Sequence, residues 1–252
     1  MALIYTDVYP YTNFSNPTII KIQKIKTRTT VNYDILIQDS TLKPSVTTRE
    51  YFNKNGILIQ TRYYEYDSSV YYIEKYHHNK SEQLVKTTRI YIDKQNVESV
   101  KYSYNKFGFL SKKIEGNIVS KYKYDKKGNL IEEKFYYKAN EESKKNTHTY
   151  EFNTNGKEIK YFTNGQLENI FLIDSLGRKV ETCNSFHNKG TKSQYIYNHF
   201  GYIDEIKIYE ADGSYGFSWI YVYDKNGNII QTSAINKTGK IDRLEKYFYS
   251  YF

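Results

Sequence analysis

YKYDKKGNL, at Tyr122–Leu130, and YVYDKNGNI, at Tyr221–Ile229, are the two stretches that decide how this 252-residue chain folds. They are full copies of one phrase, Tyr-x-Tyr-Asp/Asn-x-x-Gly, with an apolar residue two positions after the Gly. Less complete copies lie at Tyr102–Leu110, Tyr195–Ile203, Tyr51–Leu58, Tyr150–Ile159 and Phe171–Val180. Recurrence of this kind indicates one repeated supersecondary unit.

The phrase has the chemistry of a β-hairpin. Tyr-x-Tyr puts two rings on one face of a strand, because strand side chains alternate between faces. The Asp or Asn accepts hydrogen bonds from the backbone that follows and starts a turn, and Gly adopts the left-handed conformation that closes it. A type I turn with a glycine bulge is therefore predicted at each copy. The predicted turn glycines are Gly56, Gly108, Gly128, Gly156, Gly177, Gly201 and Gly227.

The phrase resembles the repeats of the YD-repeat, or Rhs-repeat, family, over roughly residues 50–252. The resemblance implies a small standalone bacterial member built from stacked antiparallel hairpins, in a cell-surface, secretion or toxin-associated setting. Large members of the family form hollow shells around a toxin domain. This chain is too short for such a shell, so that role is not expected here.

The predicted fold is all-β: an array of antiparallel β-hairpins that forms a curved or coiled sheet. The array occupies residues 49–252, and residues 1–48, which hold all three prolines and no copy of the phrase, are predicted to cap its first repeat. The 30 tyrosines suit half-buried strand surfaces. A short helix is predicted only at Ala139–Lys145.

The net charge of +9 is concentrated in residues 101–145, which carry 12 Lys against 6 Asp and Glu. This excess is consistent with contact with an acidic protein, nucleic acid or an anionic envelope polymer, and the bland alternative, a solvated lysine-rich edge that discourages aggregation, is preferred. The sequence has no run of about 18 apolar residues and no signal peptide at its start. A cytoplasmic location is expected as written, and the cell envelope or exterior if a leader has been removed.

No catalytic, cofactor or metal constellation is recognisable. The five histidines are scattered, and the Cys183–His187 spacing lacks further ligands. Asp125 and Asp224 are explained by their place at the start of a turn. The chain is therefore not expected to be an enzyme.

Surface aromatics and the lysines beside the best repeat are the candidate partner-binding residues. Exposed Tyr and Trp mark protein and sugar interfaces, and the alternative is an aromatic ladder that stabilises the sheet. Alternation places Lys121 and Lys123 on the face opposite Tyr122 and Tyr124. The predicted binding residues are Lys121, Lys123, Tyr136, Tyr137, Tyr215, Phe217 and Trp219.

Three functions follow, all of them non-enzymatic. The first is a scaffold module that binds an acidic protein through an aromatic, basic sheet surface. The second is an immunity protein that neutralises a co-encoded toxin. The third is a carbohydrate-binding envelope protein, suggested by Trp219 and the tyrosines. Nucleic acid is not favoured as a partner.

Overall fold

A computed structural model describes residues 24–35, 42–138, 146–153, 155, 157–184 and 190–252. Strands and turns account for these residues, and none of them is helical, so the all-β prediction is confirmed. The predicted helix at Ala139–Lys145 lies outside the described residues. The strands are β1 Ile25–Ile35, β2 Leu42–Phe52, β3 Leu58–Tyr64, β4 Val70–His78, β5 Leu84–Tyr91, β6 Asn96–Tyr104, β7 Leu110–Glu115, β8 Ile118–Tyr124, β9 Leu130–Tyr137, β10 Asn146–Phe152, β11 Glu158–Thr163, β12 Gln166–Ile173, β13 Lys179–Asn184, β14 Lys192–Tyr197, β15 Ile203–Tyr209, β16 Tyr215–Tyr223, β17 Ile229–Asn236 and β18 Ile241–Tyr251.

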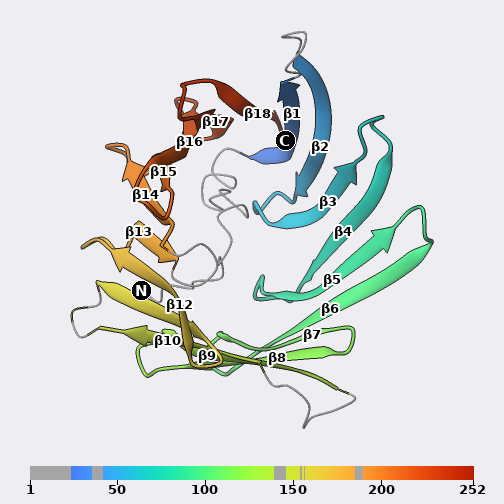
Figure 1. Cartoon of the computed structure of the whole chain (residues 1–252). Coiled ribbons are helices and arrows are strands. Elements are labelled where there is room, and N and C mark those ends of the chain that lie inside the picture. The colour runs from blue at the N-terminus through green and yellow to red at the C-terminus, as the bar shows by residue number, and fades with distance from the viewer. Residues whose placement is uncertain (1–23, 36–41, 139–145, 154, 156, 185–189) are drawn as a thin grey trace. The chain divides into compact units, whose positions relative to one another are not determined.

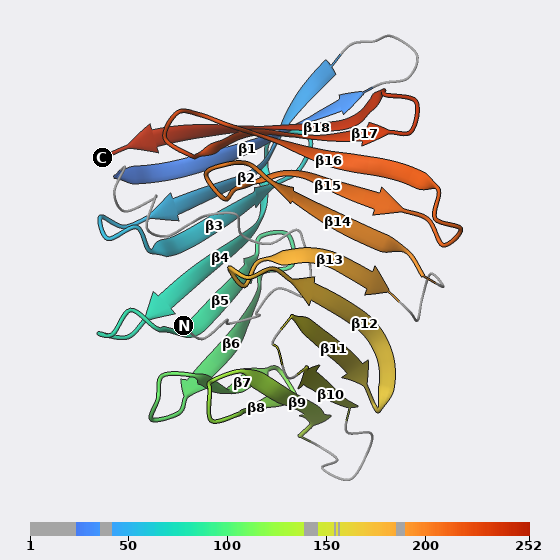
Figure 2. The same cartoon turned by 90° about the vertical axis from the view of Figure 1, so that its left-hand side faces the viewer.

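The strands pair in chain order, as antiparallel neighbours (Figure 1 and Figure 2). The first strand, β1, pairs with β2 on one side and with the last strand, β18, on the other. The ladder of strands therefore closes on itself, and the prediction of a curved or coiled sheet is wrong in this respect. Closure satisfies the N–H and C=O groups that two edge strands would expose.

Contacts divide the chain into two compact units. The described residues of unit 1 lie within Val100–Tyr197 and Ile206–Gly216, and those of unit 2 within Tyr11–Ser99, Asn198–Glu205 and Phe217–Phe252. The predicted boundary between a capping segment, residues 1–48, and the array stays a prediction. The described part of that segment forms β1 and the first half of β2.

Turns lie at six of the predicted positions and share one geometry. At Asp125, for example, Oδ1 accepts hydrogen bonds from the backbone N–H of Lys127 and Asn129, both at 2.8 Å. The N–H of Gly128 donates to the Asp125 carbonyl, and the φ of this glycine is 86°. Gly56, Gly108, Gly177, Gly201 and Gly227 have φ between 77° and 84°. Gly156 lies outside the described residues.

Gly190 corrects a further expectation. Because it lies outside every copy of the phrase, the sequence predicts that it tolerates substitution better than the turn glycines. Its φ is 101°, and its N–H donates to the Asn184 carbonyl. This glycine therefore also occupies a conformation that side chains disfavour.

In three copies of the phrase, the second tyrosine connects the repeat to the one before it. Its hydroxyl donates to the carbonyl of the residue that begins the preceding return strand. These pairs are Tyr124 to Leu110, Tyr197 to Lys179 and Tyr223 to Ile203, at 2.7–2.9 Å. Tyr249, in the Tyr-x-Tyr of the last strand and outside the phrase, donates in the same way to the Ile229 carbonyl at 2.7 Å. The phrase thus specifies both a turn and the attachment between neighbouring repeats, which sequence reasoning missed.

Each unit has its own small core. In unit 1, Tyr150, Ile159, Tyr161 and Ile173 are buried together. In unit 2, Ile25 and Phe52 are buried, with Leu58 and Tyr249 packed against them. Cross-strand packing of tyrosines and aliphatic side chains supplies the apolar contacts.

Candidate functional site

The predicted binding residues are divided between the two units. Lys121, Lys123, Tyr136, Tyr137 and Tyr215 belong to unit 1, and Phe217 and Trp219 belong to unit 2. The structure does, however, give each unit one feature with functional chemistry: a row of lysines in unit 1 and a polar cavity in unit 2.

Lys112 on β7, Lys121 on β8 and Lys134 on β9 lie directly opposite one another in the strand register. These three residues are called the lysine row below. Lys121 alternates with the half-buried Tyr122, so the row lies on the face opposite to that ring, as alternation predicts. Like charges placed directly opposite each other destabilise a sheet.

One carboxylate compensates part of this charge. Glu132 accepts ion-pair contacts from Lys123 at 2.8 Å and from Lys134 at 2.9 Å, and the hydrogen bonds from these two lysines lower its pKa. Lys121 instead has its Nζ 5.2 Å from the centre of the Tyr136 ring. Glu132 is therefore the ion-pair partner of Lys123 and Lys134, two of the lysines on this surface.

The predicted aromatic residues are only partly accessible. Tyr137 is 55% exposed and Tyr215 36%. Trp219 is half-buried, with the Arg243 guanidinium 5.8 Å from its ring centre, and it contacts Phe217 edge to face at 6.3 Å. Trp219 therefore packs within a cluster and does not stand out as a free platform.

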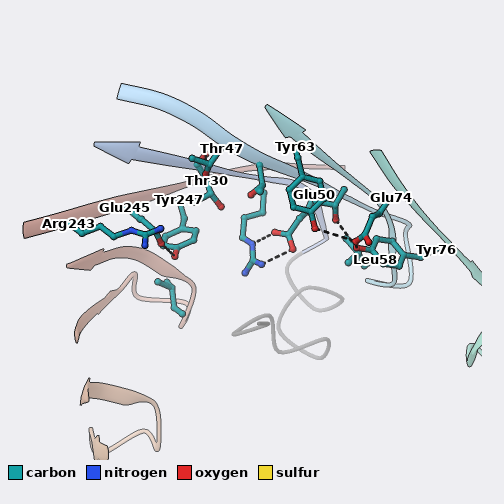
Figure 3. A pocket seen from close by; sticks show the side chains of 14 residues that line it. Thr30, Thr47, Glu50, Leu58, Tyr63, Glu74, Tyr76, Arg243, Glu245 and Tyr247 are labelled. Carbon is teal, nitrogen blue, oxygen red and sulfur yellow. Dashed lines mark hydrogen bonds and ion pairs between the residues drawn. The ribbon is translucent and has the colours of Figure 1, made fainter. Parts of the chain in front are cut away.

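A cavity of about 530 Å³ lies in unit 2, bordered by β1–β4, β17 and β18 (Figure 3). A cross-strand row crosses it, in which direct register partners follow one another from β1 to β5: Arg28, Glu50, Thr61, Glu74 and Arg89. The row places charged and hydroxyl side chains on one face of five consecutive strands.

Arg28 and Glu50 form a buried ion pair at the start of this row. The Arg28 Nη2 donates to Glu50 Oε1 at 2.9 Å, and Arg28 Nε donates to the other carboxylate oxygen. Their side chains are 12% and 8% exposed. Burial alone would lower the pKa of Arg28, but the Glu50 carboxylate outweighs it and raises that pKa.

Glu74 is held by hydroxyls from its own strand and by an arginine. Tyr72 donates to it at 2.6 Å, Tyr76 at 2.7 Å and Arg89 Nε at 3.0 Å. Burial alone would raise the pKa of Glu74, but these hydrogen bonds lower it below the usual value. Burial raises the pKa of Tyr76, and Glu74 raises it further.

The third carboxylate, Glu245 on β18, has the same kind of surroundings. Arg243 Nη2 donates to it at 2.7 Å, the Tyr247 hydroxyl at 2.9 Å and Thr232 at 3.2 Å. Every carboxylate of the cavity thus has an arginine partner. Thr30, Thr47, Thr48 and Thr61 complete a lining rich in hydroxyls.

Sequence reasoning missed this cavity. The available signal was the placement of charge inside strands at positions that share a face with tyrosines, as in Tyr72-x-Glu74-x-Tyr76. Charges are rarely buried unless they are paired, so an acidic residue between two such rings predicts a partner from another strand.

No group of residues able to hold a metal ion occurs in the described part of the chain. The Cys183 thiol donates to Glu181 Oε1 at 3.5 Å, and His187 lies outside the described residues. Where the structure describes the chain, it contains no helix long and apolar enough to span a membrane.

No protein-family model and no curated protein matches this sequence. Solved structures match distantly. TcdB2-TccC3-TEV is 12% identical, with a TM-score of 0.36 over 77% of this chain and 12% of its own. The Photorhabdus luminescens Tc holotoxin pore is 13% identical, with a TM-score of 0.39 over 83% of this chain and 13% of its own.

A porin-like protein from Bacteroides vulgatus is 12% identical, with a TM-score of 0.42 over 90% of this chain and 98% of its own. This chain thus spans only about an eighth of the length of the matched toxin chains. The matches include toxin-complex components and a porin-like protein.

Proposed function

We propose that this chain is a non-enzymatic binding module that captures an acidic protein partner on the lysine row of unit 1. The observation that carries the proposal is the direct opposition of Lys112, Lys121 and Lys134 on three neighbouring strands. Such an arrangement costs stability in the isolated protein, and a partner that brings carboxylates to it relieves the repulsion.

The chemistry of the cavity supports binding over catalysis. A general acid or base works best with a pKa near the operating pH. The pKa of Glu74 is lowered and the pKa values of Tyr63, Tyr76 and Tyr247 are raised, so each moves away from neutrality. Glu74 therefore stays ionised and the tyrosines keep their hydroxyl protons, and such constant charges and donors suit the binding of a ligand.

The setting that we propose is a bacterial cell-surface, secretion or toxin-associated system. The resemblance of the repeated phrase to YD repeats supports it. Neutralisation of a co-encoded toxin is a special case of the same proposal, in which the acidic partner is the toxin.

The experiment uses a polyglutamate peptide as the acidic probe and measures its affinity by fluorescence anisotropy at low and high salt. The triple variant Lys112→Gln, Lys121→Gln, Lys134→Gln should lose most of the affinity and most of its salt dependence, because screening acts on exposed charges. The matched control neutralises Lys225, Lys237 and Lys240, three exposed lysines of unit 2. If the two triple variants lose equal affinity for the peptide, binding depends on net charge alone, and the lysine row is not the binding site.

A second candidate function, carbohydrate binding, is favoured by the cavity of unit 2. Its volume is in the range of small-molecule sites, and its threonine and tyrosine hydroxyls and paired charges match a polar, uncharged ligand. Titration with a panel of neutral oligosaccharides, followed by calorimetry, tests it. Thr48→Ile should abolish any binding found, whereas Thr149→Ile in unit 1 should not. If both variants still show heat of binding with an oligosaccharide, the cavity is not the binding site.

A further inference from the structure

Two arginines and two tyrosines form a symmetrical cluster on β2 and β3, on the opposite face from the cavity. Arg49 and Arg62 are direct register partners. The Arg62 guanidinium lies 5.0 Å from the centre of the Tyr51 ring, and the Arg49 guanidinium lies 5.9 Å from the centre of the Tyr64 ring. Each arginine thus lies over the tyrosine of the other strand. These four residues are called the arginine–tyrosine quartet.

Neither arginine of the quartet is neutralised within the described part of the chain. Arg49 Nε donates to the Thr29 hydroxyl at 3.2 Å, which carries no charge. Arg62 Nε is buried and has no hydrogen-bond partner. Burial raises the pKa of Tyr64, so its phenol stays neutral and cannot serve as a counter-ion.

The other four arginines of the chain provide the comparison. Each has a carboxylate: Arg28 has Glu50, Arg89 has Glu74, Arg178 has Asp174 and Arg243 has Glu245. Arg178 also lies over a tyrosine, 4.3 Å from the ring centre of Tyr197. Stacking on a tyrosine therefore does not prevent an arginine of this protein from pairing with a carboxylate. The two stacked arginines of the quartet have no carboxylate partner among the described residues.

We propose that the arginine–tyrosine quartet binds a tetrahedral dianion, inorganic phosphate or the phosphate of a monoester. Two arginines at directly paired positions of β2 and β3 supply two positive charges, which one phosphate dianion neutralises. Planar guanidinium forks match phosphate oxygens, because two N–H groups of one guanidinium can donate to two oxygens of the same phosphate. A single carboxylate neutralises only one of the two charges, so it binds more weakly. The site and its ligand are independent of the lysine row.

The test titrates the full chain with inorganic phosphate at pH of about 8, where phosphate is a dianion. The readouts are the NMR signals of the arginine Nε–Hε groups and the melting temperature. Phosphate should shift the signals of Arg49 and Arg62 and raise the melting temperature. Glycerol phosphate should do the same if the site accepts a monoester, and an effect of free phosphate alone would restrict the ligand to the inorganic ion. Acetate at the same ionic strength should have little effect, and an equal effect of acetate would overturn the assignment of a dianion.

Variants locate the site. Arg62→Gln and Arg49→Gln should each weaken phosphate binding by about tenfold or more, because each removes a charged donor. The matched control, Arg178→Gln, keeps the quartet intact and should bind phosphate as the unchanged protein does. Phosphate affinity unchanged in Arg62→Gln would overturn the site. The lysine-row triple variant should bind phosphate normally, so the two proposals can fail separately.

Discussion

At the residue scale, the hydroxyl of the second tyrosine stabilises the contact between repeats in three copies of the phrase. Tyr223→Phe removes the hydrogen bond to the Ile203 carbonyl. We expect a loss of about 1 kcal/mol in the free energy of unfolding, measured in urea. Tyr137→Phe, at an exposed ring, should change it by less than about 0.5 kcal/mol. Equal effects at the two positions would contradict the structural role of the second tyrosine.

The buried ion pair of unit 2 also acts at the residue scale. Glu50→Ala leaves the Arg28 guanidinium buried without its counter-ion, and we expect a loss of about 3–5 kcal/mol in the free energy of unfolding. The double variant Arg28→Met, Glu50→Leu should recover most of that loss, because neither residue then brings charge into the cavity. If the double variant is as unstable as Glu50→Ala, the loss of stability comes from altered packing and not from the unpaired charge of Arg28.

At the element scale, the turn glycines differ in what surrounds them. Gly227 and Gly239 have nearly the same φ, 82° and 80°. A Cβ on Gly227 would lie 2.6 Å from the Tyr202 hydroxyl, whereas a Cβ on Gly239 meets nothing within 4 Å. Alanine at Gly239 should therefore cost about 1–2 kcal/mol of stability through its backbone conformation alone.

Alanine at Gly227 should cost more, because Tyr202 must move and its ring stacks on Tyr223 at 5.1 Å. Thermal unfolding of the two variants side by side measures the difference. The same melting temperature in both would mean that the contact between neighbouring repeats adds nothing to the cost of the turn.

At the scale of the whole molecule, the tyrosines set the alkaline limit of stability. Burial raises the pKa values of Tyr122, Tyr150 and Tyr223 in the folded protein, and it raises the pKa of Tyr249 to about 12. The unfolded chain releases these protons near pH of about 10. Their contribution to stability is complete below that pH and is lost as the pH rises toward the folded values.

An absorbance titration of tyrosinate beside circular dichroism checks this expectation. Exposed tyrosines should ionise first with the β signal intact, and the buried ones should ionise together with cooperative unfolding. Ionisation of all tyrosines near pH of about 10 in a folded protein would contradict the burial of these rings.

The sequence by itself determined the strands, the turns and which residues share a face. These are local properties: Asp125 accepts from Lys127 and Asn129, residues two and four positions along, and alternation alone separates Lys121 from Tyr122. The lysine excess of residues 101–145 was also visible, although its arrangement as a cross-strand row needed the register.

Only the tertiary structure decided closure, the cavity and the arginine–tyrosine quartet. Closure pairs Thr27 with Ser250, and the row through the cavity joins side chains from five strands. Which carboxylate neutralises which arginine depends on the register between strands, because a shift of one residue moves every side chain to the other face. Sequence periodicity shows which side chains of a strand lie on the same face. Hydrogen-bonded pairing between strands decides which side chains of the neighbouring strands they contact.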